Sequence, residues 1–259
     1  MAIAPTPERM QQVDRLRVEF FSDRAKLGAA AARAVRSCMI ETIASRDSVA
    51  VVFASAPSQN EFLATLANLE GIHWDKVVAF HMDEYLGLDA EAPQGFGTFL
   101  QVNLYDRVKP GQVHFLDGQA KDPEAECQRY AELLAANPVD IVCAGIGENG
   151  HLAFNDPPVA DFDDPLRVKI VELDRACRMQ QVHDGCFPDF DSVPTHALTL
   201  TIPALTGAQR IYTMVPGPTK AQAVRDTLTL PVSTGCPATV LRRHPRAVLY
   251  VDRDSASLL

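Results

Sequence analysis

The stretch DIVCAGIGENGHLAFNDP, residues 140–157, is the segment on which the predicted fold depends. Its first residues, 140–144, form a short apolar run typical of a buried strand, which leads into a glycine-rich loop at Gly145 and Gly147. Similar runs occur at residues 16–21, 49–53, 77–80, 168–171, 211–215 and 247–251, with helical stretches between them. This alternation predicts an α/β protein: one doubly wound, Rossmann-like, mostly parallel sheet flanked by helices.

Helical patterns fill the intervals between these runs. A helix is expected from about residue 23, with apolar or small residues recurring on one side at Leu27, Ala31, Ala34, Cys38 and Thr42. Others are expected at residues 59–69 and 219–227, and one after the capping pair at residues 122–123. Residues 156–166, rich in Asp and Pro, predict a surface loop or lid. No repeat or linker divides the chain, so residues 1–259 are expected to form one domain.

Charge and composition exclude several classes of function. A net charge of -9 argues against a nucleic-acid partner, because phosphate neutralisation requires a basic face. Charged or polar residues interrupt every apolar run, and residues 1–14 lack the pattern of a secretory leader, so neither a membrane span nor export is expected. The six cysteines show no paired spacing, which is typical of buried thiols in the cytoplasm.

Ligands of doubly wound folds bind where parallel strands end, which directs attention to the residues after Phe53, Phe80 and Ala144. Asp83 and Glu84 come just after the run at residues 77–80. A poorly hydrated carboxylate at such a place can act as a base toward carbon-bound protons. The alternative is that Asp83 caps a turn and Glu84 forms a surface ion pair.

The loop after Ala144 contains three glycines in six residues, which frees its backbone for tight turns close to a ligand. His151 follows directly, and an imidazole framed by such a loop can transfer protons near neutral pH. A glycine-rich turn carrying a solvated histidine would give the same pattern.

Together these segments resemble the signature of the glucosamine-6-phosphate deaminases. The matching motifs are MDEYLGL at residues 82–88 and GIGENGHLAFNDP at residues 145–157, supported by VPTHALT at 193–199 and GPTKA at 217–221. The 6-phosphogluconolactonases share the fold and a related Gly-His loop, but the AFNDP continuation is similar to the deaminase branch. The resemblance implies aldose–ketose isomerisation and deamination of glucosamine 6-phosphate to fructose 6-phosphate and ammonia, the activity of an amino-sugar-phosphate hydrolase or isomerase that needs no cofactor.

The resemblance also implies roles for single residues. Asp83 matches the base that moves the proton between C2 and C1 of the opened sugar, and His151 matches the residue that opens the ring. Asp156 occupies the place of a family glutamate that supports the histidine, and is one methylene shorter. Asn149 stands where the family often has aspartate; it can orient the imidazole but cannot stabilise its cation as a carboxylate would. The adjacent Glu148 is a candidate substitute.

Phosphate binding is implied for Lys220 and for Arg178, with Arg175 as a neighbouring alternative. The family's Gly- and Thr-rich phosphate loop is replaced here by ASAPSQNE, residues 54–61, in which Ser55 and Ser58 can still hold an anion. Residues 58–61 also read as a capping box, whose glutamate would repel a phosphate on the helix end. Either Ser55 and the loop amides hold the phosphate away from that carboxylate, or this branch binds a modified substrate.

Three other interpretations compete with the deaminase. A lactonase would use His151 with a water and would need no base at C2, and a non-catalytic sugar-phosphate sensor would tolerate the changes at Asn149 and Asp156. A metal enzyme would take His81, Asp83 and His151 as ligands. We predict no metal, and a small-molecule sugar phosphate as the partner. The oligomeric state stays open, with a homo-oligomer among the alternatives.

Overall fold

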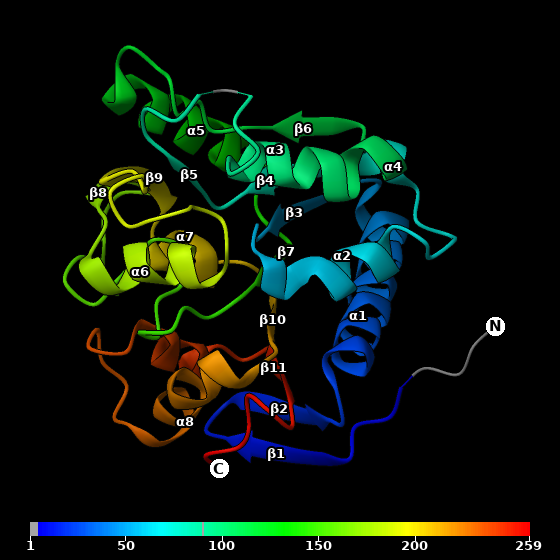
Figure 1. Cartoon of the computed structure of the whole chain (residues 1–259). Helices are drawn as coiled ribbons and strands as arrows, with labels where there is room; N and C mark the ends of the chain where they lie inside the picture. The colour runs from blue at the N-terminus through cyan, green and yellow to red at the C-terminus, as the bar shows by residue number, and fades with distance from the viewer. Residues whose placement is uncertain (1–4, 90) are drawn as a thin grey trace.

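The main sheet of the computed structural model, which describes residues 5–89 and 91–259, has eight strands in the order β1-β2-β11-β10-β7-β3-β4-β6 (Figure 1). Residues 1–4, where the segment inspected for a leader begins, lie outside the described residues. All neighbouring strands pair in parallel except β1 with β2. The strands are β1 (Arg9–Val13), β2 (Leu16–Phe21), β3 (Val49–Phe53), β4 (Val77–His81), β6 (Gln112–His114), β7 (Ile141–Ala144), β10 (Arg210–Val215) and β11 (Ala247–Asp252).

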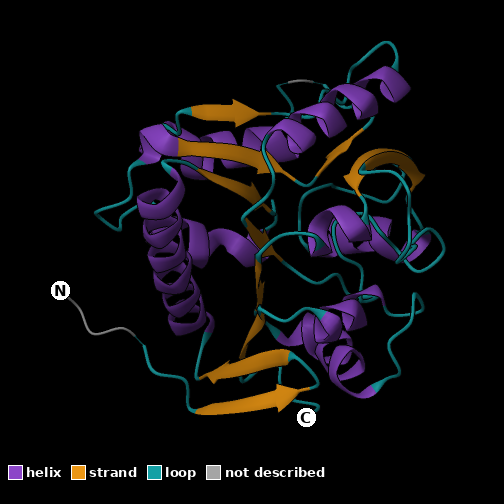
Figure 2. Cartoon of the chain, turned by 180° about the vertical axis from the view of Figure 1, so that it is seen from behind, coloured by secondary structure: helices purple, strands orange, loops and turns teal. Residues whose placement is uncertain are grey.

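Helices cover both faces of this sheet, as Figure 2 shows from behind. Alternation along each strand supplies both cores: Val51 packs toward α1 and α2, whereas Val52 packs into the core on the opposite face. The longer helices are α1 (Arg24–Arg46), α2 (Asn60–Leu66), α5 (Pro123–Ala136), α6 (Arg175–His183) and α8 (Ala221–Thr229). The short ones are α3 (Phe96–Leu100), α4 (Asp106–Val108), α7 (Ile202–Thr206), the π-turn η3 (Gln101–Tyr105) and the 3₁₀ turns η1 (Pro57–Gln59), η2 (Trp74–Lys76), η4 (Pro218–Lys220) and η5 (Pro237–Arg243).

A second, antiparallel sheet was not expected from the sequence. It has the order β5-β9-β8, formed by β5 (Asp83–Tyr85), β9 (His196–Leu200) and β8 (Val168–Glu172). The run at residues 168–171 is therefore a strand, but it does not join the parallel sheet. Its pairing partner is β9, and a single apolar run contains no information about which strand will pair with it.

The predicted helices are present, although the bounds of some differ. The helix predicted over residues 219–227 is α8, which begins at Ala221 after the 3₁₀ turn η4 and ends at Thr229. Asp23 caps α1 and Asp122 caps α5 with Pro123 at its first position, as expected. The helix predicted over residues 59–69 is shorter, because α2 ends at Leu66. On α1 the buried stripe includes Val35 and Met39, whereas two members of the predicted stripe, residues 34 and 42, are only partly buried.

The winding of the chain places a cavity at one edge of the sheet. The chain passes from β3 to β4 on one side, then returns to form β7 on the other side of β3. The loops after β3, β4, β7 and β10 therefore meet at the carboxyl edge, where such a switch in strand order opens a crevice.

Two further expectations can be compared with the structure. Within the described residues, no helix combines the length and the apolar character needed to cross a bilayer. All six cysteines are free thiols, and five of them are buried, with Cys186 partly exposed.

Candidate active site

The cavity at the carboxyl edge is lined by residues from the segments after β3, β4, β7 and β10, and from β5, α3 and α6. Its volume is about 60 Å³, and it adjoins a hollow of about 320 Å³ that shares Ser55, Ala56, Phe96 and Gln181 with it. The cavity is lined by Ala54, Ser55, Ala56, Ser58, Met82, Asp83, Phe96, Gly145, Ile146, Gly147, His151, Ala153, Phe154, Gln180, Gln181, Asp184 and Lys220. The structure thus brings five of the eight predicted site residues to its wall.

His151 is held from behind by two more of the predicted residues. Its Nδ1 lies 2.7 Å from Oδ1 of Asp156, which is fully buried. Asn149 donates from Nδ2 to the same Oδ1 at 2.8 Å, and its own Oδ1 accepts from the backbone N–H of His151 at 3.1 Å. Although burial opposes ionisation, His151 and Asn149 together hold the pKa of Asp156 below its usual value. A carboxylate at Nδ1 fixes the imidazole and leaves Nε2 for the substrate.

These contacts show how the chain accommodates two departures from the family pattern at the level of geometry. Asp156 reaches the imidazole directly, so no water is needed to span the missing methylene. Asn149 contacts the backbone of His151 and the carboxylate, and so orients the pair rather than the ring itself. Glu148 lies 3.3 Å from His183 and is not the substitute for the missing aspartate.

The loop can approach the imidazole this closely only because residue 147 is glycine. A Cβ built on Gly147 would lie 2.2 Å from Nε2 of His151, well inside van der Waals contact. The backbone of Gly147 also donates to the carbonyl of His151 at 3.0 Å. The glycine therefore supplies space for the ring as well as a tight turn.

Asp83 lies on β5 with only 6% of its surface exposed. Burial, with smaller contributions from the charges of Glu84 and Asp156, raises the pKa of Asp83 well above its usual value. Such a carboxylate holds a proton more tightly than a hydrated one, which suits a group that must take a proton from carbon. The structure thus supports the buried-base interpretation of Asp83 over a turn cap.

Glu84 has a structural place instead. Its carboxylate accepts backbone N–H groups of Tyr85, Phe96 and Gly97 at 2.9–3.1 Å, which anchors the start of α3. It is buried, so the alternative of a surface ion pair is wrong.

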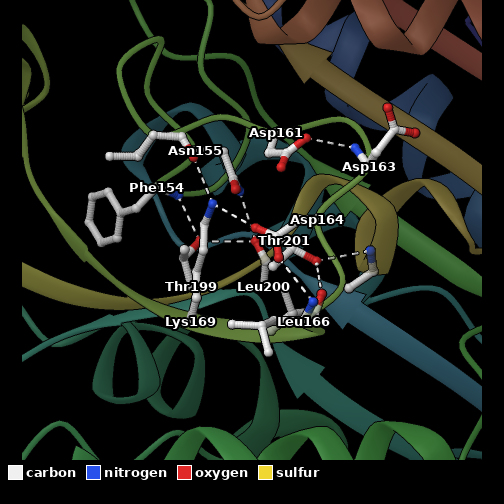
Figure 3. A network of polar contacts seen from close by, with 12 residues as sticks. Phe154, Asn155, Asp161, Asp163, Asp164, Leu166, Lys169, Thr199, Leu200 and Thr201 are labelled. Atoms are coloured by element: carbon white, nitrogen blue, oxygen red, sulfur yellow. Dashed lines mark hydrogen bonds and ion pairs between the residues drawn. The ribbon is translucent and has the colours of Figure 1, made fainter. Parts of the chain in front are cut away.

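The segment after His151 is tied to the strand that also positions Asp83 (Figure 3). Thr199 of β9 pairs with Asp83 across the small sheet, and its hydroxyl accepts the backbone N–H of Phe154 at 3.1 Å. Asn155 donates to the carbonyls of Leu152 and Leu200 at 2.9 and 2.8 Å. Asp83 and His151 are thus carried by segments that β9 connects.

The predicted lid is fastened at its base in the same network (Figure 3). Lys169 of β8 donates to the carbonyl of Val159 at 2.7 Å and pairs with Asp164 at 2.9 Å. The hydroxyl of Thr201 donates to the carbonyl of Leu166 at 2.8 Å. The stretch is a loop, as expected, and these contacts hold it against the small sheet.

Lys220 reaches the cavity from the loop after β10 and is 5% exposed. Burial lowers the pKa of Lys220, and the charges of Asp184 and Glu148 partly offset this. Ser55 and Ser58 face it from the loop after β3, and the Ser55 hydroxyl is buried without a hydrogen-bond partner in the described part of the chain. An ammonium and an unpaired hydroxyl at one wall form a small anion-binding corner.

The capping box predicted for residues 58–61 does not form. No side chain caps η1 or α2, and Glu61 instead pairs with Arg24 of α1, with Nε–Oε1 at 2.6 Å. The Glu61 carboxylate, which was expected to repel a phosphate, is therefore neutralised by Arg24, which is distant in the sequence. This removes the main objection to an anion beside Ser55.

Arg178 does not line the cavity. Its guanidinium donates to the carbonyls of Phe190 and Val193 at 2.8 and 2.9 Å and stacks over the Phe190 ring at 3.9 Å. Arg175 lies over the same ring, so the alternative arginine is also directed away. These two hydrogen bonds and the ring contact hold the guanidinium away from the cavity. The sequence alone does not reveal these contacts.

Two glutamines from the same helix reach the cavity in place of an arginine. Gln180 accepts the backbone N–H of Glu148 at 2.7 Å, and Gln181 is 94% buried at the junction with the larger hollow, since only 6% of its surface is exposed. Sequence reasoning missed both. A pair of adjacent glutamines on a helix has no distinctive spacing, and only the fold brings them to the strand ends.

The predicted absence of a metal remains a prediction. The possible ligand atoms of His151, Asp156 and Cys177 lie within 4.8 Å of one another. Burial raises the pKa of the Cys177 thiol well above its usual value, which disfavours the thiolate that metals require. The triad with His81 is not assembled, because His81 Nε2 accepts the backbone N–H of Leu116 at 2.8 Å.

Comparison with known proteins shows the family to which this chain belongs. The family described as glucosamine-6-phosphate isomerases/6-phosphogluconolactonase matches residues 22–250. The chain belongs to this family. Among curated members of the glucosamine-6-phosphate isomerase/6-phosphogluconolactonase family, the glucosamine-6-phosphate deaminases of Bacillus thuringiensis (strain Al Hakam) and Bacillus anthracis (strain A0248) are 40% identical over 183 residues, 71% of this chain and 68% of theirs.

Solved structures of the family agree with the fold. A monomeric glucosamine-6-phosphate deaminase superposes with a TM-score of 0.85 at 30% identity, covering 93% of this chain and 99% of that one. A 6-phosphogluconolactonase from Thermotoga maritima superposes with a TM-score of 0.73 at 20% identity, covering 91% and 98%. The second likeness shows the shared fold of the glucosamine-6-phosphate isomerase/6-phosphogluconolactonase family alone.

The substitution Asp156→Asn tests how the imidazole of His151 is positioned. The amide can donate to Nδ1 and move the ring proton to Nε2, so we expect kcat to fall about a hundredfold or more. Steady-state turnover checks this, with Asp161→Asn on the exposed part of the same loop as the matched control. Unchanged turnover in Asp156→Asn would show that this carboxylate does not position His151.

Proposed function

We infer that the chain is an isomerase-type deaminase that converts glucosamine 6-phosphate to fructose 6-phosphate and ammonia. The observation that carries this is the joint presence, in one cavity, of a buried carboxylate, Asp83, and a carboxylate-backed imidazole, His151. Its 40% identity to glucosamine-6-phosphate deaminases supports the same reaction. We also propose that the chain acts as a monomer, as the superposing deaminase described as monomeric does.

The chemistry divides between the two groups. His151, through Nε2, accepts the proton of the C1 hydroxyl and returns one to the ring oxygen, which opens the sugar to its aldehyde. Asp83 removes the proton from C2 and delivers it to C1, while the C2 ammonium gives up a proton and O1 gains one, so that an iminium forms at C2 and an alcohol at C1. Water then adds to C2, and the C–N bond breaks to release ammonia and leave the ketone. No electron donor or acceptor is needed, because C1 is reduced as C2 is oxidised.

The phosphate of the substrate is proposed to bind at the corner formed by Lys220, Ser55 and Ser58. Burial lowers the pKa of Lys220 and the charges of Asp184 and Glu148 offset this only in part, so an arriving phosphate would add a further anionic partner. Gln181 stands at the junction with the larger hollow and is proposed to donate to the same anion. Arg178 is not part of this proposal, since its guanidinium is held by two carbonyls.

A lactonase would also use an imidazole and a phosphate corner. It would not require a second, strongly buried carboxylate in the cavity, because hydrolysis of a lactone moves no carbon-bound proton. A sensor would not require the imidazole to be fixed at 2.7 Å by a fully buried carboxylate. The geometry therefore favours the isomerising deaminase over both alternatives.

The test is direct. Purified protein is given glucosamine 6-phosphate, and ammonia and fructose 6-phosphate are measured in parallel. We expect the two products in equal amounts, with both lost in His151→Ala. Hydrolysis of 6-phosphogluconolactone without ammonia release would replace this proposal by the lactonase, and binding of glucosamine 6-phosphate without products would replace it by the sensor.

Lys220→Ala tests the phosphate corner. Loss of a hydrogen bond to a charged group costs about 1.5–3 kcal/mol, so we expect KM to rise by about tenfold to a hundredfold while kcat changes little. Lys121→Ala, on the exposed surface, is the matched control and should leave both constants unchanged. An unaltered KM in Lys220→Ala would place the phosphate elsewhere.

A further inference from the structure

A second cavity lies at the amino edge of the parallel strands, opposite the candidate active site, and arginines line it. It has a volume of about 480 Å³ and shares no residue with the candidate active site. We call it the arginine cavity; its basic residues are Arg15, Arg17, Arg210 and Arg246. Ser37, Cys38 and Glu41 of α1 form the facing wall.

The register of three neighbouring strands aligns these side chains. In the parallel ladder of β10 and β11, Ile211 pairs with Ala247, so Arg210 and Arg246, each one residue earlier, stand side by side. The register of β11 with β2 pairs Val248 with Arg17, and Arg15 lies in the turn just before β2. Adjacent strands lie about 4.8 Å apart, so the row presents neighbouring guanidinium groups on one face. Residues two positions further on, 212 and 248, line the same cavity, as strand alternation requires.

The charges of this row are only partly compensated. Arg210 lies 4.0 Å from Glu41, the one acidic residue of the cavity wall. In the described part of the chain, the exposed side chains of Arg15 and Arg246 have no hydrogen bond or ion pair. Arg17 pairs with Glu19 at 3.0 Å, so Arg15 and Arg246 are the two arginines of the cavity whose charge stays unpaired among the described residues, in a protein whose net charge is -9. Repulsion within such a row destabilises the fold unless an anion compensates it.

We propose that the arginine cavity binds a phosphoryl group, carried by a small phosphate monoester or by inorganic phosphate. A guanidinium presents a planar fork of donors that matches phosphate oxygens in pairs, and two forks on adjacent strands can hold one phosphoryl group between them. The volume is in the range of small-molecule sites. Hydroxyls of Ser37 and Tyr212 add donors at the wall. This site goes beyond the proposed deaminase reaction and does not depend on it.

Inorganic phosphate is the first probe, measured by titration calorimetry on the whole protein. The parent carries Lys220→Ala, which weakens the phosphate corner of the active site and leaves the arginine cavity intact. Adding Arg15→Gln and Arg246→Gln should raise the dissociation constant at least about tenfold, since each replacement removes charged hydrogen bonds. The matched control, Arg107→Gln with Arg225→Gln, removes the same charge from exposed positions elsewhere and should change the constant less than about twofold.

Equal weakening in the two double variants would overturn the site, because it would trace binding to overall charge. A parent that does not bind phosphate would overturn it as well. Arg246→Lys keeps the charge without the fork and should weaken binding partway, with unfolding temperatures confirming that all variants fold. Titration of glycerol 3-phosphate then identifies which molecule carries the phosphoryl group. If glycerol 3-phosphate binds more tightly than inorganic phosphate, the ligand is an organic ester; if the two bind equally, it is free phosphate.

Discussion

Replacing Asp83 by asparagine is expected to reduce kcat for deamination of glucosamine 6-phosphate by about a thousandfold. Removal of a positioned general base costs about two to four orders of magnitude. Among the described residues that line the cavity, the other carboxylate, Asp184, does not lie on the small sheet. The amide keeps the shape and a hydrogen-bonding oxygen, so substrate affinity should change little. Turnover and calorimetric titration of the substrate separate these two effects.

Exchange of the C2 proton with solvent deuterium gives a sharper measurement of the same step. It should disappear in Asp83→Asn and persist in Asp89→Asn, the exposed control six residues along. Because burial raises the pKa of Asp83 and only the ionised form accepts a proton, kcat/KM should fall on the acid side at a pH above the usual range of carboxyl groups. Normal exchange in Asp83→Asn would remove this residue from the mechanism.

Gly147→Ala should be nearly as damaging although it changes no polar group. The new methyl would lie 2.2 Å from the imidazole of His151, so the ring must leave its place over Asp156 or the loop must move. Displacement of a reacting group by about 1 Å can cost about a hundredfold in rate, and overpacking costs about 1–3 kcal/mol of stability. We expect kcat to fall about a hundredfold or more and the unfolding temperature to fall as well.

Gly235→Ala is the matched control for this substitution. Its Cβ would meet its nearest neighbour at 3.5 Å, an ordinary contact, and its backbone needs no positive φ. Turnover and thermal unfolding of both variants compare a glycine whose Cβ would clash with one whose Cβ would fit. Wild-type turnover in Gly147→Ala would mean that the imidazole acts from another position, and the pairing with Asp156 would then lose its proposed role.

The local pattern of the sequence determined most of the sheet and the core of the candidate site. Apolar runs marked β2, β3, β4, β7, β10 and β11. The runs are continuous in β3, β4, β7 and β11, which are buried at every position, because burial on both faces requires continuous apolar residues. Glycines followed by His151, and a carboxylate just after a buried strand, pointed to the right loops. Each signal spans only a few residues, and in a parallel sheet the ends of such strands meet at one edge.

Only the tertiary structure decided which partners the long side chains contact and which strands the short strands pair with. Arg178 turns to carbonyls of residues 190 and 193, Glu61 pairs with Arg24, and Gln181 takes the place expected for an arginine. The small sheet and the arginine cavity likewise join segments that are far apart in the chain. Each outcome is a competition among partners distant in sequence, and its winner depends on distances that a local pattern does not contain.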